Sequence, residues 1–401
     1  DSLHTRESLV PSLGIAMVAA CLRDAGFFPE IIDLRLEHRN MKQVLGFIEK
    51  EKPLFVGLSA FTDEIVQAGK TAEIIKKIFP EAKIVIGGPH AILMPEKILE
   101  EFPHFDIAVI GEGEKTAVNI AESLAKNKRI SNIKGIAYRK KEKIILNKIN
   151  PPLDINSLPL PAWDLFELKC YNNIFVVSTS RGCPYRCYFC SPMYLGNRVR
   201  LRSPEKVVRE IDYIVNKFNA KKIQFADAAF NIRIENTERI CDLILEKNLD
   251  KKIKWDCETR ADNINPQVLK KMKKAGCKTI AIGVESGSEK ILKEVVKKGE
   301  TKEQIRRGVR MIKKARINVR CFFIIGHYKE GRREILETIK FAIELAPDSL
   351  SFGLIVPNPG SEFRELAEKE LGGMRILHSR WDDYNQFNYS CYEKANMPIK
   401  E

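Results

Sequence analysis

The stretch TSRGCPYRCYFC, residues 179–190, decides how the rest of this chain is interpreted. It places Cys183, Cys187 and Cys190 close together in a loop that also contains a proline. Loops run over the surface of a protein, so three thiols in one loop are not simply buried apolar groups. The chain has ten cysteines among 401 residues, and this spacing should arise by chance in well under roughly one such chain in a hundred. The triplet therefore predicts a metal site.

Two kinds of metal site use several cysteines at short spacing. A structural zinc site closes its tetrahedron with a fourth Cys or His, and no histidine lies between His104 and His327. Three thiolates can instead hold three irons of a four-iron four-sulfur cluster and leave the fourth iron without a protein ligand. The cluster fits the triplet better, and zinc is the alternative.

Six strand and helix units fill the second half of the chain, and the triplet directly follows the first strand. The expected strands are IFVVSTS from Ile174, KIQFAD from Lys222, IKWDCET from Ile253, KTIAIGVES from Lys278, NVRCFFIIG from Asn318 and SLSFGLIV from Ser349. Six such units fit a partial (βα)6 barrel of the TIM type better than an open nucleotide-binding sheet. We assign residues 173–371 to this barrel and leave residues 372–401 as a C-terminal extension of unknown role.

Residues 1–145 form a second α/β domain, in which short β-branched runs alternate with helical patterns. The expected strands are Ile31–Leu34, Leu54–Ser59, Lys83–Ile86, Ile107–Ile110 and Ile133–Tyr138, and the expected helices include Leu13–Leu22, Thr62–Phe79 and Lys115–Lys126. This alternation predicts a doubly wound, Rossmann-like parallel sheet with helices on both faces. Such a fold normally starts with a strand, so we expect that the first strand is missing. Residues 146–172 contain several prolines and are expected to be a linker.

Composition limits the class of protein. The formal net charge of +14 could attract a polyanion, but Lys alternates with Glu in Glu289–Glu300, as on an ion-paired, solvated surface. We therefore expect no nucleic-acid partner. No run reaches the roughly 18 to 20 apolar residues of a membrane span, and the cysteines lack a secretory context. We expect a cytoplasmic protein with reduced thiols that does not span a membrane.

The triplet, with the aromatic Phe189 just before its last cysteine, resembles the signature of the radical S-adenosylmethionine (SAM) superfamily. The resemblance implies that Cys183, Cys187 and Cys190 are the catalytic, metal-binding residues that hold a 4Fe-4S cluster. It further implies that the open iron chelates SAM and that reduction of the cluster yields a 5′-deoxyadenosyl radical. A reducing partner such as ferredoxin or flavodoxin would supply the electron. The protein would orient these cofactors and exclude water.

Other strand ends match this superfamily in the expected order. Asp227, in FADAAF, lies where the family contacts the methionine amino group, and Glu285 and Ser286, in GVESGS, lie where it usually meets the ribose. IIGHYKEG departs from the commoner glycine-leucine-proline-glycine turn by carrying His327 and Tyr328, whereas VPNPGSEF matches closely. The alternative for each acidic residue is a helix cap or a solvated carboxylate.

The N-terminal domain resembles the cobalamin-binding domain that is joined to many radical SAM enzymes. Its motifs LGIAMVAACLRDAG, IIDL, GLSAFT, GGPHA and IGEGE fall in that family's order. The resemblance implies cobalamin as a further cofactor. The residues that would line the corrin site are Ser59, Phe61, Thr62, Gly87, Gly88, His90, Gly111, Glu112 and Gly113. No histidine follows the Asp-x-His-x-x-Gly pattern of a lower cobalt ligand, and His90 is equally interpreted as a packed loop residue.

Together the two resemblances imply a cobalamin-dependent radical SAM enzyme that methylates an unactivated carbon, or a phosphorus, of a small-molecule or lipid substrate. Radical ring closure or carbon–carbon coupling of the anaerobic cyclase type is the alternative reaction. An RNA-modifying enzyme and a non-catalytic corrin-binding regulator are alternatives of other classes. Radical methylthiotransferases carry a second cysteine triplet in their first domain, whereas this first domain has only Cys21.

Overall fold

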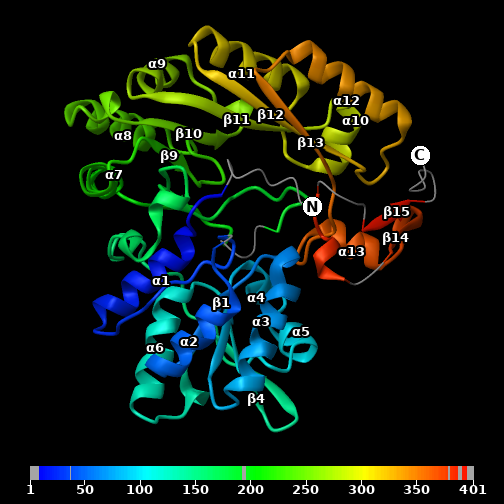
Figure 1. The fold of residues 1–401 in the computed structure, drawn as a ribbon. Coiled ribbons are helices and arrows are strands. Elements are labelled where there is room, and N and C mark those ends of the chain that lie inside the picture. The colour runs from blue at the N-terminus through cyan, green and yellow to red at the C-terminus, as the bar shows by residue number, and fades with distance from the viewer. Residues whose placement is uncertain (1–8, 37, 192–195, 378–379, 387–390, 395–401) are drawn as a thin grey trace. The chain divides into compact units, whose positions relative to one another are not determined.

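The computed structural model describes residues 9–36, 38–191, 196–377, 380–386 and 391–394 (Figure 1). The chain divides into two compact units, Asp1–Asn172 and Asn173–Glu401. The residues predicted to be a linker belong to the first unit, and the C-terminal extension belongs to the second. Each unit is described by itself.

The first unit is built on a five-stranded sheet in the order β1-β2-β3-β4-β5. Its strands are β1 (Val56–Ser59), β2 (Ile84–Gly87), β3 (Ile107–Val109), β4 (Ile136–Lys140) and β5 (Lys143–Leu146). β1, β2 and β3 pair in parallel, whereas β4 and β5 pair antiparallel. The carboxyl ends of the three parallel strands therefore meet at one edge of the sheet.

Helices cover both faces of this sheet, as predicted. They are α1 (Leu13–Asp24), α2 (Met41–Glu51), α3 (Ile65–Ile78), α4 (Pro89–Leu93), α5 (Pro95–Glu101) and α6 (Gly113–Ala125). Figure 1 shows α1 and α6 together on one side of the sheet and α3, α4 and α5 on the other. Helices on both faces are what short parallel strands need to bury both sides of the sheet.

Two strand predictions for this unit were wrong. Ile31–Leu34 is not a strand: the Asp33 side chain accepts the backbone N–H of Arg35 at 3.0 Å and its guanidinium, which stabilises a turn instead. The segment predicted as Ile133–Tyr138 begins later, at Ile136, and pairs antiparallel with β3. A tight turn at Lys141 joins it to β5, a strand that sequence analysis did not predict. Such two-residue hairpins depend on left-handed turn residues, and Lys141 has a φ of 53°.

The second unit contains all six predicted strands in one parallel sheet, in the order β13-β12-β11-β10-β9-β6. They are β6 (Ile174–Val177), β9 (Lys222–Phe225), β10 (Lys254–Thr259), β11 (Cys277–Glu285), β12 (Asn318–Ile325) and β13 (Ser349–Leu354). β6 and β13 are the two edges, so the sheet is a partial barrel and does not close.

Amphipathic helices connect these strands along the outer side of the curved sheet (Figure 1). They are α7 (Pro204–Phe218), α8 (Ile234–Glu246), α9 (Pro266–Lys274), α10 (Glu289–Ile291), α11 (Lys302–Lys314) and α12 (Arg332–Leu345), whereas α13 (Glu362–Glu368) follows the last strand and contacts β14. In α7, the Ser203 hydroxyl caps the first turn, Pro204 takes the first helical position, and Asn219 ends the helix in a left-handed conformation. Serine, proline and asparagine are residue types that are favoured at these three helix positions.

Two short antiparallel pairs complete the second unit. β7 (Ser180–Arg181) pairs with β8 (Arg200–Leu201), and β14 (Met374–Ile376) pairs with β15 (Tyr392–Lys394). The second pair belongs to the C-terminal extension, where Met374 and Tyr392 are buried in one apolar cluster with Tyr188. Among the described residues, no helix is long and apolar enough to cross a membrane.

Candidate functional site

The cysteine loop begins and ends in the β7–β8 pair, which follows the carboxyl end of β6. Gly182 directly precedes Cys183 and has a φ of 93°. A Cβ atom at Gly182 would overlap the Arg198 carbonyl, so glycine is required there. The Cys183 backbone N–H donates to the Gly196 carbonyl at 3.1 Å and the Cys190 N–H donates to the Cys187 carbonyl at 3.0 Å. These two bonds define the turns on which the three cysteines lie.

Asp227, which follows β9, holds the start of this loop. Its carboxylate accepts the backbone N–H of Thr179 at 3.0 Å, the Thr179 hydroxyl at 3.0 Å and the Ser180 hydroxyl at 2.6 Å. Its side chain is buried, and burial raises the pKa of Asp227 despite these hydrogen bonds. The structure therefore shows Asp227 positioning the loop, and contact with the SAM amino group stays a prediction.

Tyr188 fixes the middle of the loop, between the second and third cysteines. Its hydroxyl lies 3.0 Å from His327 Nδ1 and accepts the Tyr328 backbone N–H at 3.1 Å. Its carbonyl accepts the Phe363 N–H at 2.9 Å. Sequence analysis did not select Tyr188. The available indication was its position between two candidate cluster ligands, Cys187 and Cys190.

The thiols lie in partly desolvated surroundings. Burial raises the pKa of Cys187 to about 12 and that of Cys190 to about 11, and the Lys298 ammonium opposes both shifts. Each of the ten cysteines, all within the described residues, is free of a disulfide. A metal displaces the thiol proton when it binds. Three free thiols on one loop beside a buried cation are a donor set that fits an anionic iron–sulfur cluster.

Lys298 and its partners form a charged network beside the loop. The ammonium lies 3.0 Å from Glu285 Oε1 and 3.1 Å from Glu300 Oε2, and it also donates to the Gly283 carbonyl. Burial lowers the pKa of Lys298, but the two carboxylates outweigh it, so the net pKa is raised. Sequence analysis missed Lys298, because nothing in the local pattern distinguishes it from the exposed Lys297 beside it.

The same network reaches the cysteine loop through Arg260. Its guanidinium lies 3.7 Å from the centre of the Tyr185 ring, a cation–π contact, and pairs with Asp262 at 2.6 Å. Tyr185 lies between the first two cysteines. Arg260 was also missed, since an arginine at a strand end has many surface roles.

Glu285 is the last residue of β11 and Ser286 directly follows it, and the two side chains contact different surroundings. Glu285 has a φ of 65° after a β-bulge, and its carboxylate faces Lys298. The buried Ser286 hydroxyl lies 3.2 Å from Thr338 Oγ1 and accepts the Ser288 N–H at 3.2 Å, which ties β11 to α12. The structure therefore uses Ser286 for packing, and its contact with SAM stays a prediction.

Phe189 and His327 lie against Tyr188. The Phe189 ring centre is 6.0 Å from that of Tyr188 and 6.2 Å from that of His327. The buried Glu330 carboxylate accepts the backbone N–H groups of Gly326 and His327 at 2.6 and 3.1 Å. The turn that departs from the commoner motif is thus held by a buried carboxylate and packs on the cysteine loop.

In the first unit, the predicted corrin-site residues lie at or just after the carboxyl ends of β1, β2 and β3. Ser59 and Phe61 are both exposed, and 58% of Phe61 is accessible to solvent. Ligands of open parallel sheets bind at this edge. An exposed aromatic ring at that edge offers apolar contact to a flat ligand.

The glycines at this edge differ in whether the fold itself requires a glycine at that position. A Cβ at Gly88, which has a φ of 92°, would lie 2.7 Å from the Ala60 carbonyl, so the fold itself requires that glycine. Cβ atoms at Gly87, Gly111 and Gly113 would meet nothing closer than 3.9, 3.4 and 3.5 Å. A Cβ would therefore fit at Gly87 and Gly113, so the fold itself does not require glycine there, and close approach of a corrin ring to the backbone stays the prediction.

Three further predicted residues make contacts within the unit. The buried His90 has Nδ1 3.2 Å from the Thr62 hydroxyl, which ties α4 to the segment after β1. Glu112 accepts the Leu153 backbone N–H at 2.8 Å, so it holds the proline-rich segment. These contacts explain the residues structurally, and their contact with cobalamin stays a prediction.

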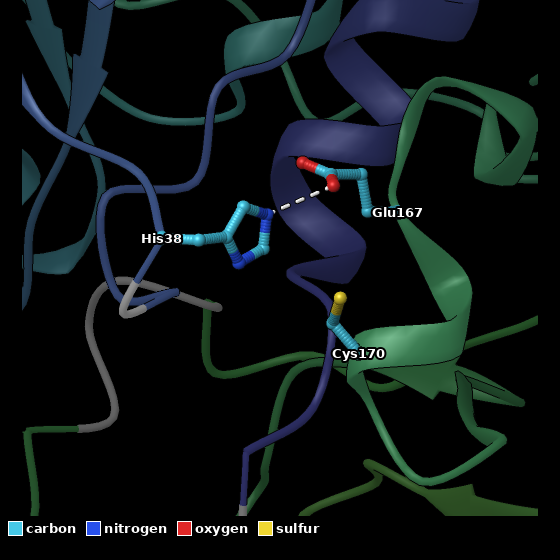
Figure 2. Close-up of side chains that lie close together, drawn as sticks. All are labelled: His38, Glu167 and Cys170. Carbon is cyan, nitrogen blue, oxygen red and sulfur yellow. Dashed lines mark hydrogen bonds and ion pairs between the residues drawn. The ribbon is translucent and has the colours of Figure 1, made fainter.

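A second group of metal-ligand types lies in the first unit (Figure 2). Ligand atoms of His38, Glu167 and Cys170 lie within 4.8 Å of one another. However, the Glu167 carboxylate is already bound by His38 Nε2 at 2.9 Å and by Arg39 Nε at 2.5 Å. A guanidinium on the same carboxylate opposes a divalent cation. We interpret the group as an ion-paired attachment of the proline-rich segment.

Comparison with protein families gives two matches that divide the chain as the sheets do. Residues 177–342 match the Radical SAM superfamily, and residues 2–121 match the B12 binding domain. The first match contains the cysteine loop, and the second contains all the strand-end loops of β1, β2 and β3.

Curated relatives cover nearly the whole chain. An uncharacterized methyltransferase of Pyrococcus horikoshii is 33% identical over 380 residues, which span 93% of this chain and 81% of that protein. An anaerobic magnesium-protoporphyrin IX monomethyl ester cyclase of Cereibacter sphaeroides is 28% identical over 94% of this chain, which spans only 62% of the cyclase.

Solved structures show the same architecture. The cobalamin-dependent SAM radical enzyme OxsB, with aqua-cobalamin and SAM bound, has a TM-score of 0.74 at 25% identity over 82% of this chain and 49% of its own. The radical SAM methyltransferase TsrM from Kitasatospora setae has a TM-score of 0.78 at 19% identity, covering 98% and 82%. The second likeness shows the fold alone.

Proposed function

The chain belongs to the radical SAM superfamily and carries a B12 binding domain, and from this we propose that it methylates an unactivated carbon or a phosphorus of its substrate. It is a radical SAM enzyme whose cofactors are a 4Fe-4S cluster, SAM and cobalamin. When bound, these groups supply a reducing electron, a radical precursor and a methyl group. The observation that carries the proposal is the presence in one chain of a built cysteine loop and a corrin-type strand edge.

The residues of the second unit would divide the work at the cluster. Cys183, Cys187 and Cys190 would hold it, while Asp227 and Tyr188 fix the loop from both sides. The buried Lys298 ammonium would offset the negative charge of the thiolates and of the cluster. Glu285, held by Lys298, is positioned at the end of β11, where we propose that it hydrogen-bonds SAM.

Methylation is favoured over ring closure by the relatives. The methyltransferase of P. horikoshii is 33% identical and this chain spans 81% of it, whereas the figures for the cyclase of C. sphaeroides are 28% and 62%. Ring closure is therefore the second candidate. An external reductant is needed in either case, and we propose ferredoxin or flavodoxin as its source.

Product analysis of the reconstituted protein tests this proposal. Protein with cluster and cobalamin is incubated anaerobically with SAM and titanium(III) citrate, and a matched sample lacks cobalamin. We expect 5′-deoxyadenosine from both samples and S-adenosylhomocysteine only from the sample with cobalamin. Formation of 5′-deoxyadenosine without S-adenosylhomocysteine, even in the sample with cobalamin, would favour ring closure. Absence of 5′-deoxyadenosine from both samples would contradict the radical assignment.

A further inference from the structure

The strands of the second unit run parallel, so their amino ends meet at one side of the sheet, opposite the carboxyl ends that carry the cysteine loop and Asp227. Four segments lead into β9, β10, β11 and β12. We call them together the amino-end rim, which consists of residues 219–222, 249–254, 273–278 and 313–318. The rim contains ten lysines, one arginine and a single acidic residue, Asp250. Its cations are Lys221, Lys222, Lys251, Lys252, Lys254, Lys273, Lys274, Lys278, Lys313, Lys314 and Arg316.

The rim cations differ from other lysines of the second unit in lacking an acidic partner. All of them are exposed, and among the residues that the structure describes no ion pair reaches any of them. By contrast, Lys271, just before the rim, lies 3.0 Å from Asp242, and Lys247 lies 3.1 Å from Asp212. The protein therefore leaves the charge of the rim uncompensated.

Hydrogen bonds show that the rim segments are neighbours in space. The Lys254 backbone N–H donates to the Lys221 carbonyl at 2.9 Å, which joins the segments before β9 and β10. The Lys273 ammonium, before β11, donates to the Arg316 carbonyl, before β12. The cations thus form one continuous basic surface.

The acidic residues close to the rim in sequence do not balance it. Asp348, before β13, accepts the Val319 backbone N–H at 2.8 Å. Glu344, near the end of α12, pairs with Arg306. Only Asp250 belongs to the rim itself.

Helix ends account for only part of this pattern. The carboxyl end of a helix favours cations, which explains Lys273 and Lys274 in the last turn of α9, and Lys313 and Lys314 in that of α11. The remaining rim cations lie outside the α-helices, so the helix dipole does not explain them.

Exposed apolar side chains lie beside the basic surface. The Lys313 ammonium donates to the carbonyl of Leu345, the last residue of α12, at 3.3 Å. In the same helical turn Ile343 is 73% exposed, and Leu350, at the start of β13, is 44% exposed. Lysines beside exposed apolar side chains are typical of surfaces that bind the interface of a membrane.

We propose that the amino-end rim docks the protein on an anionic membrane surface, with its lysines among the lipid headgroups and Ile343 in the bilayer interface. Each lysine near such a surface strengthens binding about five-fold. Docking there leaves the cysteine loop, at the opposite ends of the strands, open to a soluble reductant. The inference is independent of the proposed methylation.

Two other acidic partners fit the rim less well. Nucleic acids are recognised by arginines and by aromatic side chains that stack on bases, whereas the rim has one arginine and no aromatic residue. An acidic reductant has to approach the cluster. The nine residues of β11 span roughly 25–30 Å between the two sides of the sheet.

Vesicle co-sedimentation tests the inference on the full chain with cluster and cobalamin, kept without oxygen. One set of vesicles contains phosphatidylcholine and phosphatidylglycerol in equal parts, and the other contains phosphatidylcholine alone. We expect binding to the anionic vesicles only. Raising the salt concentration from about 0.1 M to about 1 M should remove most of it, because the Debye length falls from about 10 Å to about 3 Å.

A triple variant of the rim, Lys274→Gln with Lys278→Gln and Lys314→Gln, should weaken this binding about 100-fold. These side chains are exposed, so the fold should not change. The matched control loses the same charge from exposed lysines of the first unit and should bind like the wild type. It combines Lys128→Gln, Lys140→Gln and Lys143→Gln.

Ile343→Asn should weaken binding about ten-fold, whereas Ile78→Asn, at an exposed position of the first unit, should have no effect. Absence of binding to anionic vesicles, or equal losses in the two triple variants, would overturn the inference. So would equal binding of the two isoleucine variants. Tighter binding to polyuridylate than to the anionic vesicles would also overturn it and would indicate a nucleic-acid surface.

Discussion

The cysteine loop and the corrin-type strand edge hold their candidate sites in different ways. The loop is fixed by side chains from separate strands and turns, including Asp227, Arg260 and His327. At the strand edge, Gly87 and Gly113 present backbone without a side chain, and Ser59 and Phe61 are exposed. A small anionic cluster needs a few ligands in fixed positions, whereas a large flat ring needs an uninterrupted surface.

This difference predicts how each site responds to mutation. Removing a side-chain contact should disturb the loop, whereas adding atoms should disturb the strand edge. The following predictions test that contrast, from the largest expected effect to the smallest.

Replacing Cys183, Cys187 and Cys190 together by alanine should abolish the cluster. Wild-type protein purified without oxygen should contain about four irons and four sulfides, and the triple variant none. Cys170→Ala, which changes a cysteine of the first unit, is the matched control and should keep the full content. Stoichiometric zinc without sulfide in the wild type would contradict the assignment.

Asp227→Ala should destabilise the second unit by about 1–3 kcal/mol, because buried donors of Thr179 and Ser180 lose their acceptor. Denaturant unfolding followed in the holoprotein measures the change. Asp242→Ala, which removes an exposed pair with Lys271 on α8 and α9, is the control and should cost at most about 1 kcal/mol. Equal effects of the two substitutions would mean that Asp227 does not anchor the loop.

Gly87→Leu and Gly113→Leu should each weaken cobalamin binding about ten-fold, because their side chains would occupy the flat surface. Gly87→Ala and Gly113→Ala should change thermal stability little, since the fold leaves room for a Cβ at both positions, and melting of the leucine variants shows whether their longer side chains also disturb the fold. Gly88→Ala should show the reverse order, losing stability first. Undiminished cobalamin binding by both leucine variants would place the corrin elsewhere.

Glu167→Gln should have the smallest effect, about 0.2–1 kcal/mol, since its pairs with His38 and Arg39 are partly exposed. The His38 hydrogen bond, together with Arg39, holds the pKa of Glu167 below its usual value despite some burial. Its contribution should therefore be present above the ordinary glutamate pKa and be lost as the pH falls through the lowered one. The free energies of unfolding of the wild type and of Glu167→Gln are compared at pH 7 and pH 3. Stabilisation of the wild type by zinc would instead support a metal site at His38, Glu167 and Cys170.

The sequence pattern predicted the second unit well because β-branched and aromatic runs alternate with amphipathic helices, and several strands, such as β10, β11 and β12, end in recognisable motifs. The cysteine triplet could be predicted because cluster binding constrains its spacing. Sequence analysis could not identify Lys298, Arg260 and Tyr188, because they act through contacts between distant segments that no local pattern indicates.

The first unit was harder to predict for a related reason. Ile31–Leu34 has the composition of a strand, yet Asp33 satisfies the local backbone and also accepts the Tyr171 hydroxyl at 2.7 Å. The antiparallel β4–β5 hairpin follows from a turn at Lys141, a residue with no strong turn preference. Neither turn is indicated by the residue types of its segment, and only the Asp33–Tyr171 bond is a long-range contact.

The ratio of the two nucleoside products during turnover of the true substrate tests the central claim most directly. A cobalamin-dependent methylase consumes two SAM molecules per turnover, one to remethylate cobalamin and one to form the radical. With SAM deuterated in its methyl group, we predict near-equal S-adenosylhomocysteine and 5′-deoxyadenosine, and the label in the product. Formation of 5′-deoxyadenosine and product without a matching amount of S-adenosylhomocysteine, and without deuterium in the product, would contradict methylation. The radical assignment would not be affected by that result.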